Sequence, residues 1–189
     1  MRIHIGSDHA GLDFKNELIT HLVMNGHDVT DHGPYEYDAL DDYPDFCIPC
    51  AEAVAKNPES LGIVLGGSGN GEQMAANKVK GVRAALVWSI ETAKLAREHN
   101  DANVISLGGR MHDEEFCLKL VDTFLTTPFS GDERHVRRIG LISKYEKNGL
   151  LISTEKFEKA NPQFKSMLDE QVSKGANIFK NLGSNINDF

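Results

Sequence analysis

Residues 61–78 read LGIVLGGSGNGEQMAANK, and this stretch decides the fold. The apolar run LGIVL at 61–65 is typical of a buried strand of a parallel sheet. Four glycines surround Ser68 in the next six residues, and a helical pattern starts at 71. Because glycine lets backbone N–H groups converge, such a turn between a strand and a helix can bind an anion.

Glu72 limits what that turn can bind, because a carboxylate is a poor neighbour for a phosphate. A dinucleotide-binding fingerprint has two residues between its second and third glycines, but here only one residue separates Gly69 from Gly71. A Walker loop needs a lysine where Glu72 stands. Neither motif is present. A purely structural turn, in which Glu72 only favours the helix dipole, stays open on these residues alone.

The same alternation of strand and helix extends along the chain. Short β-prone runs stand at 2–5, 28–30, 82–88 and 103–108 in addition to 61–65, and helical patterns stand near 11–25, 44–56, 71–77, 90–99, 113–125 and 132–147. Strands separated by helices form parallel sheets with right-handed crossovers. The sequence therefore predicts a doubly wound α/β sandwich with a five-stranded parallel sheet.

Composition predicts one globular domain with an appendage and a small-molecule partner. The chain has 189 residues, of which 40% are hydrophobic and 25% charged. A formal net charge of −8 disfavours nucleic acid and anionic membrane surfaces as partners. Three cysteines, no apolar run near 18 residues and no signal-like start indicate a soluble protein of the cytoplasm.

Polar residues follow several of the predicted strands. They include Asp8 and His9, the glycine stretch, His99 and Asn100 at the end of the fourth helix, and Arg110. Doubly wound folds bind ligands at the carboxyl ends of the strands, so we expect these groups to gather at that one edge. Each group taken singly is also compatible with ordinary loop solvation or helix capping.

Four motifs in order resemble the ribose-5-phosphate isomerase type B family, which includes the galactose-6-phosphate isomerase subunits. They are GSDHAG at 6–11, GGSGNGEQMAANK at 66–78, LAREHNDANVISLGGR at 95–110 and ERHVRRI at 133–139. The resemblance covers about residues 1–148 and is closest to an actinobacterial-like branch. It implies a Rossmann-like αβα sandwich, a homodimer or larger homo-oligomer with sites shared across the interface, and aldose–ketose isomerisation of a sugar phosphate without metal or cofactor.

The resemblance also gives Glu72 a role. In the family's reference branch a cysteine base stands where this chain has Gly66, and in the branch resembled here the glutamate takes the proton. Moving a proton between C1 and C2 requires one base that reaches both carbons and donors for the enediolate oxygen. Ser68 resembles the family's assisting hydroxyl, and the remaining loop residues Gly67, Gly69, Asn70 and Gly71 are expected to bind the substrate.

His99 is the candidate for opening the sugar ring, because imidazole exchanges protons near neutral pH. The family assigns it that role, whereas a histidine at a helix C-terminus can also simply favour the helix dipole. Asp8 is expected to hold a sugar hydroxyl or to assist His99. His9 and Asn100 resemble substrate-contacting positions of the family.

The phosphate requires cations away from Glu72. Arg134 and Arg138 are four residues apart and so share one helical face, while Arg137 points off it. A solvated helix surface is the ordinary interpretation of such a basic run. The family instead implies that Arg134 and Arg138, together with Arg110, bind the phosphate, and His135 is counted among the substrate-binding residues without an assigned role.

Cys47 and Cys50 do not predict a metal or redox site. A structural zinc site needs two more ligands, and Cys117 is the only other cysteine. We expect both residues to pack as small apolar side chains near the start of a helix, and Trp88 to lie in the core. No metal is implied.

Residues 149–189 extend beyond the resemblance. Phe164, Leu168 and Val172 repeat at four-residue spacing, which predicts a helical C-terminal extension. Three functions stay open on the sequence: ribose 5-phosphate isomerisation, the same chemistry on a four- or six-carbon sugar phosphate, and sugar-phosphate binding without catalysis. A nucleotide-binding enzyme is disfavoured by the missing fingerprint.

Overall fold

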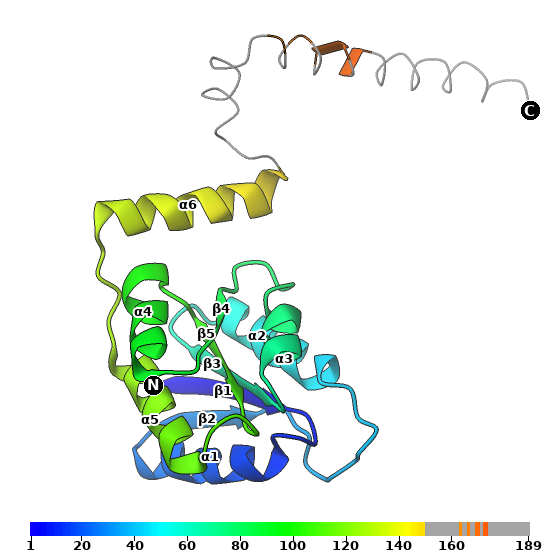
Figure 1. Ribbon diagram of the computed structural model, residues 1–189, viewed down its shortest axis with the longest axis vertical. Coiled ribbons are helices and arrows are strands. Elements are labelled where there is room, and N and C mark those ends of the chain that lie inside the picture. The colour runs from blue at the N-terminus through cyan, green and yellow to red at the C-terminus, as the bar shows by residue number, and fades with distance from the viewer. Residues whose placement is uncertain (150–162, 164–165, 167–168, 171, 174–189) are drawn as a thin grey trace, which may run out of the picture. The chain divides into compact units, whose positions relative to one another are not determined.

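The computed structural model describes residues 1–149 and residues 163, 166, 169–170 and 172–173. Five strands alternate with helices along the chain (Figure 1). In order, the elements are β1 (Arg2–Ser7), α1 (Leu12–Met24), β2 (Asp28–Asp31), α2 (Pro44–Lys56), β3 (Leu61–Gly66), α3 (Asn70–Ala76), β4 (Ala84–Leu86), α4 (Ile90–Asn100), β5 (Val104–Gly108), α5 (Glu114–Thr126) and α6 (Glu133–Asn148).

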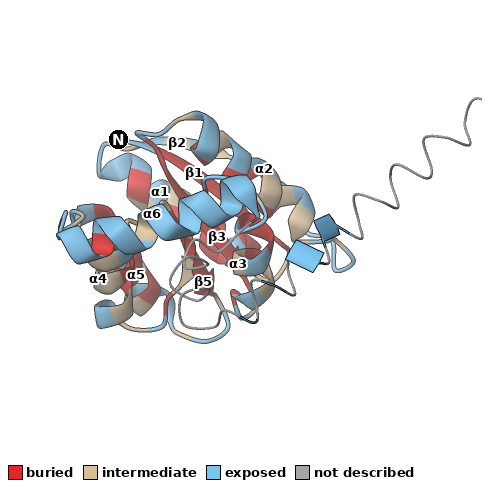
Figure 2. Ribbon diagram, turned by 90° about the horizontal axis from the view of Figure 1, so that it is seen from above, coloured by how far each residue is buried: buried red, intermediate tan, exposed pale blue. Residues whose placement is uncertain are grey.

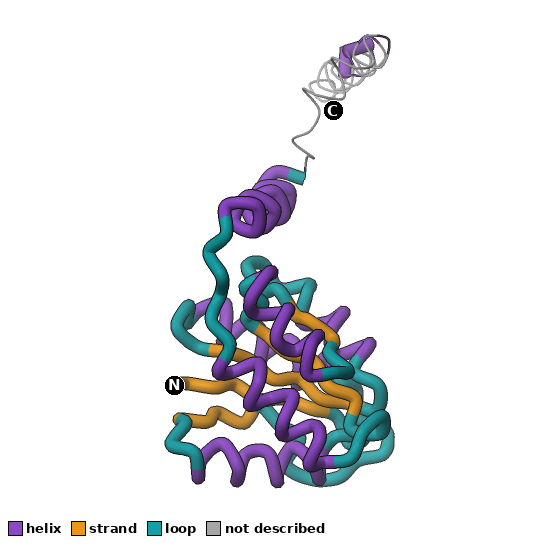
Figure 3. The backbone as a smooth tube through the Cα atoms, turned by 60° about the vertical axis from the view of Figure 1, so that its left-hand side comes forward, coloured by secondary structure: helices purple, strands orange, loops and turns teal. Residues whose placement is uncertain are grey.

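All five strands are parallel, and their order in the sheet is β2-β1-β3-β5-β4. The chain winds outward from β1 to β2 and then crosses to β3 on the other side of β1. The point between β1 and β3 is therefore a topological switch point, where doubly wound folds bind their ligands. The strands lie side by side and each is followed by a helix that returns along the sheet (Figure 3).

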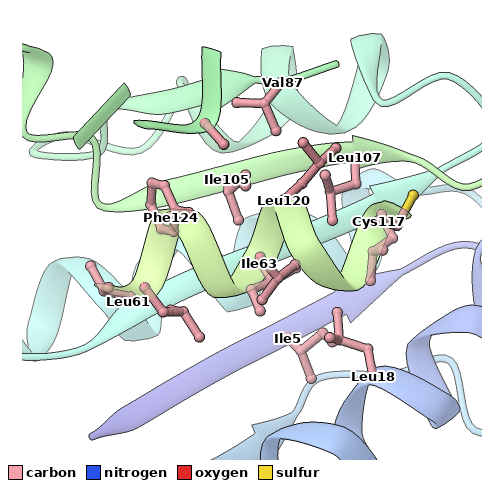
Figure 4. Packing of buried hydrophobic residues seen from close by; sticks show 14 of the residues in the cluster. Ile5, Leu18, Leu61, Ile63, Val87, Ile105, Leu107, Cys117, Leu120 and Phe124 are labelled. Carbon is pink, nitrogen blue, oxygen red and sulfur yellow. The ribbon is translucent and has the colours of Figure 1, made fainter. Parts of the chain in front are cut away.

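Two apolar clusters flank the sheet. One joins odd-numbered strand residues such as Ile63 and Ile105 to α1, α4 and α5, and Figure 4 shows Leu18, Leu120 and Phe124 packed within it. The other joins Val64 and its neighbours to α2 and α3. Successive strand residues thus point to opposite layers. The three central strands β1, β3 and β5 are buried along nearly their whole length (red in Figure 2), which explains why β3 reads as a continuous apolar run, whereas β2 and β4 at the sheet edges are only partly buried.

These elements confirm the predicted fold class, the five-stranded parallel sheet and every predicted strand and helix up to residue 148, with bounds that differ by at most two residues at either end. Cys47 and Cys50 lie on α2 and are fully buried, as expected of packing residues. Burial raises the pKa of Cys50 to about 12, so its thiol stays protonated.

The prediction that Trp88 lies in the core is wrong, because its side chain is 60% exposed. The strand ends at Leu86, two residues earlier than the predicted run. Val87 turns into the core, and the following residue then points outward. An edge strand of three residues leaves little apolar surface beyond it for a tryptophan to cover.

Two compact units, Met1–Gly140 and Leu141–Phe189, make up the chain, so their boundary falls within α6. The division predicted at residues 148 and 149 stays a proposal. Phe164 and Leu168 of the predicted C-terminal helix lie outside the described residues, whereas Val172 is helical and exposed. None of the helices among the described residues has the length and apolar content needed to span a bilayer.

Candidate active site

Three loops meet at the carboxyl ends of the central strands. The register pairs Ser7 of β1 with Leu65 of β3, and Gly66 of β3 with Gly108 of β5. Backbone hydrogen bonds then join the second and third loops, from Gly109 N to Gly66 O at 2.8 Å and from Arg110 N to Gly67 O at 3.2 Å. The sheet therefore brings the segments after β1, β3 and β5 together at the switch point.

The glycine loop is held in the shape of a helix N-terminus. Gly69 has a φ of 80°, and a Cβ there would collide with the backbone of Leu107, so both its conformation and its space require glycine. Ser106 donates a 2.7 Å hydrogen bond from Oγ to Gly69 O and fixes the loop to β5. The exposed Ser68 hydroxyl accepts from the side-chain amide of Asn70 at 3.2 Å. The loop thus offers backbone donors and one hydroxyl to a ligand.

Glu72 lies in the first turn of α3 and only 4% of it is exposed. Burial raises the pKa of this carboxyl group, a hydrogen bond from its own backbone N–H opposes the shift, and the charge of Asp8 adds to it. Buried carboxyl groups with raised pKa values beside a ligand cleft are typical of acid–base residues.

Asp8 and His9 follow β1 directly. Asp8 is buried, and its Oδ1 accepts from Ala10 N at 2.9 Å. His9 bonds twice to Asp41, from its backbone N at 3.1 Å and between its Nδ1 and Asp41 Oδ1 at 2.6 Å. Asp8, His9 and Asp41 have ligand atoms within 4.8 Å of one another, which is near enough for a metal ion. The sequence analysis considered only the cysteines as metal ligands, and it did not consider Asp8, His9 and Asp41 as a group.

Arg110 completes this first group at the carboxyl edge. Its guanidinium lies beside Gly67, since a Cβ on Gly67 would be 3.6 Å from Arg110 Nη1. The side chain is exposed and so is accessible to an anionic ligand. The first group of predicted site residues therefore contains Asp8, His9, Gly67, Ser68, Gly69, Asn70, Gly71, Glu72 and Arg110.

A second group of predicted site residues lies at the C-terminal end of α4 and the N-terminal end of α6. The rings of His99 and His135 lie 4.2 Å apart between centroids. His135 Nδ1 lies 2.9 Å from Ser130 Oγ, and its Nε2 accepts from Arg134 Nε at 3.1 Å. Burial lowers the pKa of His135, and the neighbouring His99 and Arg134 act in the same direction. Asn100, Arg134 and Arg138 are exposed beside this pair of rings.

The prediction that all these residues gather at one edge of the sheet is wrong. α4 returns along the sheet, so its last turn lies where strands begin: Arg83, just before β4, donates from Nε to Asn100 O at 3.0 Å. A cavity of about 660 Å³ near this turn is lined by Met1, Leu61 and Asp101, among others. His99 and Asn100 therefore lie at the amino edge, and Glu72 lies at the carboxyl edge.

Sequence reasoning also missed Asp41 and Tyr43, from the segment between β2 and α2. Asp41 contacts His9, and the ring of Tyr43 lies against Gly71. The signal was present, because this segment follows the carboxyl end of a strand as the other site loops do. It was overlooked because no glycine-rich or basic motif marks it.

Comparison with known proteins places this chain in a family. Residues 3–142 match the model of the family described as Ribose/Galactose Isomerase. Ribose-5-phosphate isomerase B of Mycolicibacterium paratuberculosis is 57% identical over 147 residues, which cover 78% of this chain and 92% of that protein. Ribose-5-phosphate isomerase B of Mycobacterium tuberculosis is 56% identical and covers 78% of this chain and 91% of that protein.

A solved structure is similar over the same share of the chain. It is ribose-5-phosphate isomerase B from Mycoplasma genitalium with bound ribulose 5-phosphate, with 49% identity, a TM-score of 0.76 and coverage of 78% of this chain and 97% of that one. The fold and these relatives together define an isomerase of the Rossmann-like α/β class. The chain belongs to the ribose/galactose isomerase family.

Proposed function

We propose that this chain interconverts D-ribose 5-phosphate and D-ribulose 5-phosphate through a cis-enediolate. The relatives that carry this activity in their names are more than half identical to the chain, and a similar structure was solved with the ketose bound. The site contains acid–base groups and an amide cradle, which are the parts that proton transfer between two carbons requires. The cytoplasm, where sugar phosphates are processed, is the proposed location.

Glu72 is the base in this proposal, and its burial is the observation that carries the function. The carboxylate lies at the switch point beneath a loop of backbone donors and is nearly closed to solvent. Desolvation makes the carboxylate a stronger base, since the raised pKa brings it closer to that of the proton it must accept. One carboxylate that reaches both C1 and C2 can remove the proton from one carbon and return it to the other.

The glycine loop stabilises the intermediate. The backbone N–H groups of Gly69 and Gly71 at the N-terminus of α3 would stabilise the negative charge that develops on the enediolate oxygen, while Asn70 N donates to Ser68 Oγ at 3.4 Å. The Ser68 hydroxyl is an additional donor there. Such preorganised donors cost no reorganisation during the reaction.

A second copy of the chain completes the site. His99, Asn100, Arg134, His135 and Arg138 lie at the other edge of the sheet from Glu72, so one chain supplies two half-sites rather than one site. In a two-fold symmetric dimer each half-site of one chain faces the complementary half-site of its partner. Exposed apolar residues near both halves, including Met74, Trp88, Met111 and Val136, suit such an interface.

Within that dimer, His99 opens the sugar ring and the arginines hold the phosphate. The ring of His135 packs on His99 and restrains its orientation, while Arg134 and Arg138 present their guanidinium groups from the first turns of α6. Arg110 approaches the same substrate from the first half-site. The steps use only acid–base and hydrogen-bonding groups of the chain and require no metal or cofactor.

A substrate panel tests the proposal. Rates of isomerisation of ribose, allose, galactose and erythrose phosphates are compared as kcat/KM, and ribose 5-phosphate is expected to exceed the others by at least about tenfold, the effect of one misplaced group in a shaped pocket. A preference for a four- or six-carbon sugar phosphate would support the proposed isomerisation chemistry but would show that ribose 5-phosphate is not the substrate. Binding of ribose 5-phosphate without ketose formation would leave a sugar-phosphate-binding protein.

A further inference from the structure

We propose that Asp41 is a positioning residue for His9: its carboxylate fixes the imidazole with a hydrogen on Nδ1 and leaves Nε2 to bind an oxygen of the sugar phosphate. The inference rests on the proposed function and extends it to a residue that neither the motifs nor the phosphate cluster include. Asp41 lies in the loop of residues 32–43 between β2 and α2.

The hydrogen bonds of Asp41 converge on one residue. Its side chain is only 8% exposed, and its Oδ1 accepts from both the backbone N and the ring Nδ1 of His9. Oδ2 has no partner within the described part of the chain. A carboxylate that capped its own turn would accept from backbone N–H groups nearby in sequence, as Asp38 does from Leu40. The buried charge of Asp41 is directed at His9 instead.

This geometry determines which ring nitrogen faces the ligand. A carboxylate only accepts hydrogen bonds, so the 2.6 Å separation requires the hydrogen on Nδ1. Nε2 is then an acceptor when the ring is neutral and a donor when it is cationic. The ring of Tyr37 meets that of His9 edge-on at 5.9 Å and restrains its plane.

The loop that carries Asp41 is anchored firmly enough to position a side chain. His32 N donates to Ile5 O at 2.8 Å, and Ser7 N donates to Gly33 O at 3.0 Å, so the loop starts along β1. Lys15, fully buried, donates to Pro34 O at 2.7 Å and to both carboxylate oxygens of Asp31. These contacts fix the start of the loop, and α2 fixes its end.

A divalent cation among Asp8, His9 and Asp41 is the competing interpretation of the same trio. The hydrogen bonds favour the positioning role, because the facing atoms of His9 and Asp41 already share a proton at 2.6 Å and Asp8 Oδ1 accepts from Ala10 N. A cation bound by those two facing atoms would have to displace that proton. The two interpretations differ in their response to chelators.

Kinetics of Asp41→Asn test the inference, with Asp42→Asn as the matched control. The control removes the same charge from the exposed neighbouring residue. Asp41→Asn is expected to raise KM for ribose 5-phosphate about 10- to 100-fold, the usual effect of losing a charged hydrogen bond, with kcat within about threefold of the wild-type value. The control should leave both constants unchanged. Equal small effects of the two substitutions would overturn the inference.

A double-mutant cycle with His9→Ala shows whether Asp41 acts through His9. Once the ring is absent, Asp41→Asn should change KM by less than about twofold, because its target is gone. Effects that simply multiply would assign Asp41 an independent role and contradict the inference. Loss of activity on chelation, restored by a divalent cation, would favour the metal site instead.

A spectroscopic measurement needs neither turnover nor a variant that folds. The ¹⁵N spectrum of the wild-type imidazoles at pH 8 should show His9 with its hydrogen on Nδ1, and Nε2 should shift when ribose 5-phosphate is added. A hydrogen on Nε2 would overturn the inference. If the wild-type protein failed to isomerise any sugar phosphate, the proposed function would fail while the tautomer of His9 still tested the positioning role.

Discussion

A Cβ atom on Gly66 would overlap the carboxylate of Glu72, so the last residue of β3 must be glycine while Glu72 keeps this position. The two residues are six apart in sequence, and the turn of the glycine loop brings the carboxylate back over the end of the strand. A cysteine at position 66, as in the family's reference branch, and a glutamate in this pose therefore exclude each other.

Gly66→Ala should displace Glu72 and lower kcat at least about 100-fold, toward the loss expected when a general base is misplaced. The proper control is Gly62→Ala on the same strand, whose added methyl would press on Val54 and Val104 instead. That variant should unfold at a lower temperature and keep its kcat. A Gly66→Ala enzyme as active as the control would show that Glu72 is not held where the structure has it.

Folding stability should fall in acid because of a pair of histidines, of which His4 is buried and His32 is half-buried. His4 Nδ1 and His32 Nε2 lie 3.1 Å apart, and burial lowers the pKa of both rings below the ordinary value of 6.5. The unfolded chain therefore binds these protons at a higher pH than the folded chain does. Their contribution to stability is complete above pH 6.5 and is lost as the pH falls through and below that value.

Denaturant unfolding between pH 5 and pH 8 measures this dependence. His32→Gln removes one titrating ring and keeps a side chain that can hydrogen-bond to His4, so its unfolding free energy should depend less steeply on pH below 6.5. If the unfolding free energies of the wild type and of His32→Gln fell equally with decreasing pH, other groups would cause the acid sensitivity.

The fold was predictable from local patterns, because parallel strands that are buried on both faces must be apolar throughout, as residues 61–66 are. The glycine turn and Glu72 were predictable as well, because they stand together in one short stretch of sequence. The edge on which His99 lies was misjudged, since a helix end was grouped with strand ends. Asp41 could not be assigned to His9, because 32 residues separate them and only the anchored loop brings them together.

Mixing two inactive variants should restore activity if the half-sites combine between chains. In a mixed dimer of His99→Ala and Glu72→Gln chains, one site has both native residues and the other has neither. Random exchange of subunits then yields about a quarter of the wild-type sites, because half of the dimers are mixed and each carries one intact site. No recovery after exchange confirmed by mass spectrometry would place each site within one chain.

Arg138→Ala should weaken binding of the phosphate specifically. Loss of a guanidinium–phosphate contact is expected to raise KM for ribose 5-phosphate about tenfold or more, and to leave any slow activity on unphosphorylated ribose unaffected. Arg137→Ala is the matched control, because Arg137 lies next to it on α6 but off the shared face of Arg134 and Arg138. Equal losses on both substrates would remove Arg138 from the phosphate site.

Glu72→Gln should also make the protein more stable. Burial raises the pKa of this carboxyl group above its ordinary value of 4.5, so the ionised side chain present at neutral pH destabilises the fold. Glutamine keeps the shape without the charge, and its thermal unfolding at pH 7.5 should occur at a higher temperature. At a pH well below 4.5, where the glutamate is protonated in both states, the gain should shrink. If the gain in stability did not depend on pH, the buried charge of Glu72 would not be its cause.

The rate of proton transfer in Glu72→Gln tests the central claim most directly. General base catalysis contributes about 10²–10⁴-fold, and this reaction consists of little else, so kcat should fall by about 10⁴-fold while KM changes far less. Exchange of the C2 hydrogen of ribose 5-phosphate with solvent deuterium, followed by NMR, should vanish together with turnover. A variant that kept more than about a tenth of the wild-type kcat, or that still exchanged the C2 hydrogen, would show that Glu72 is not the base.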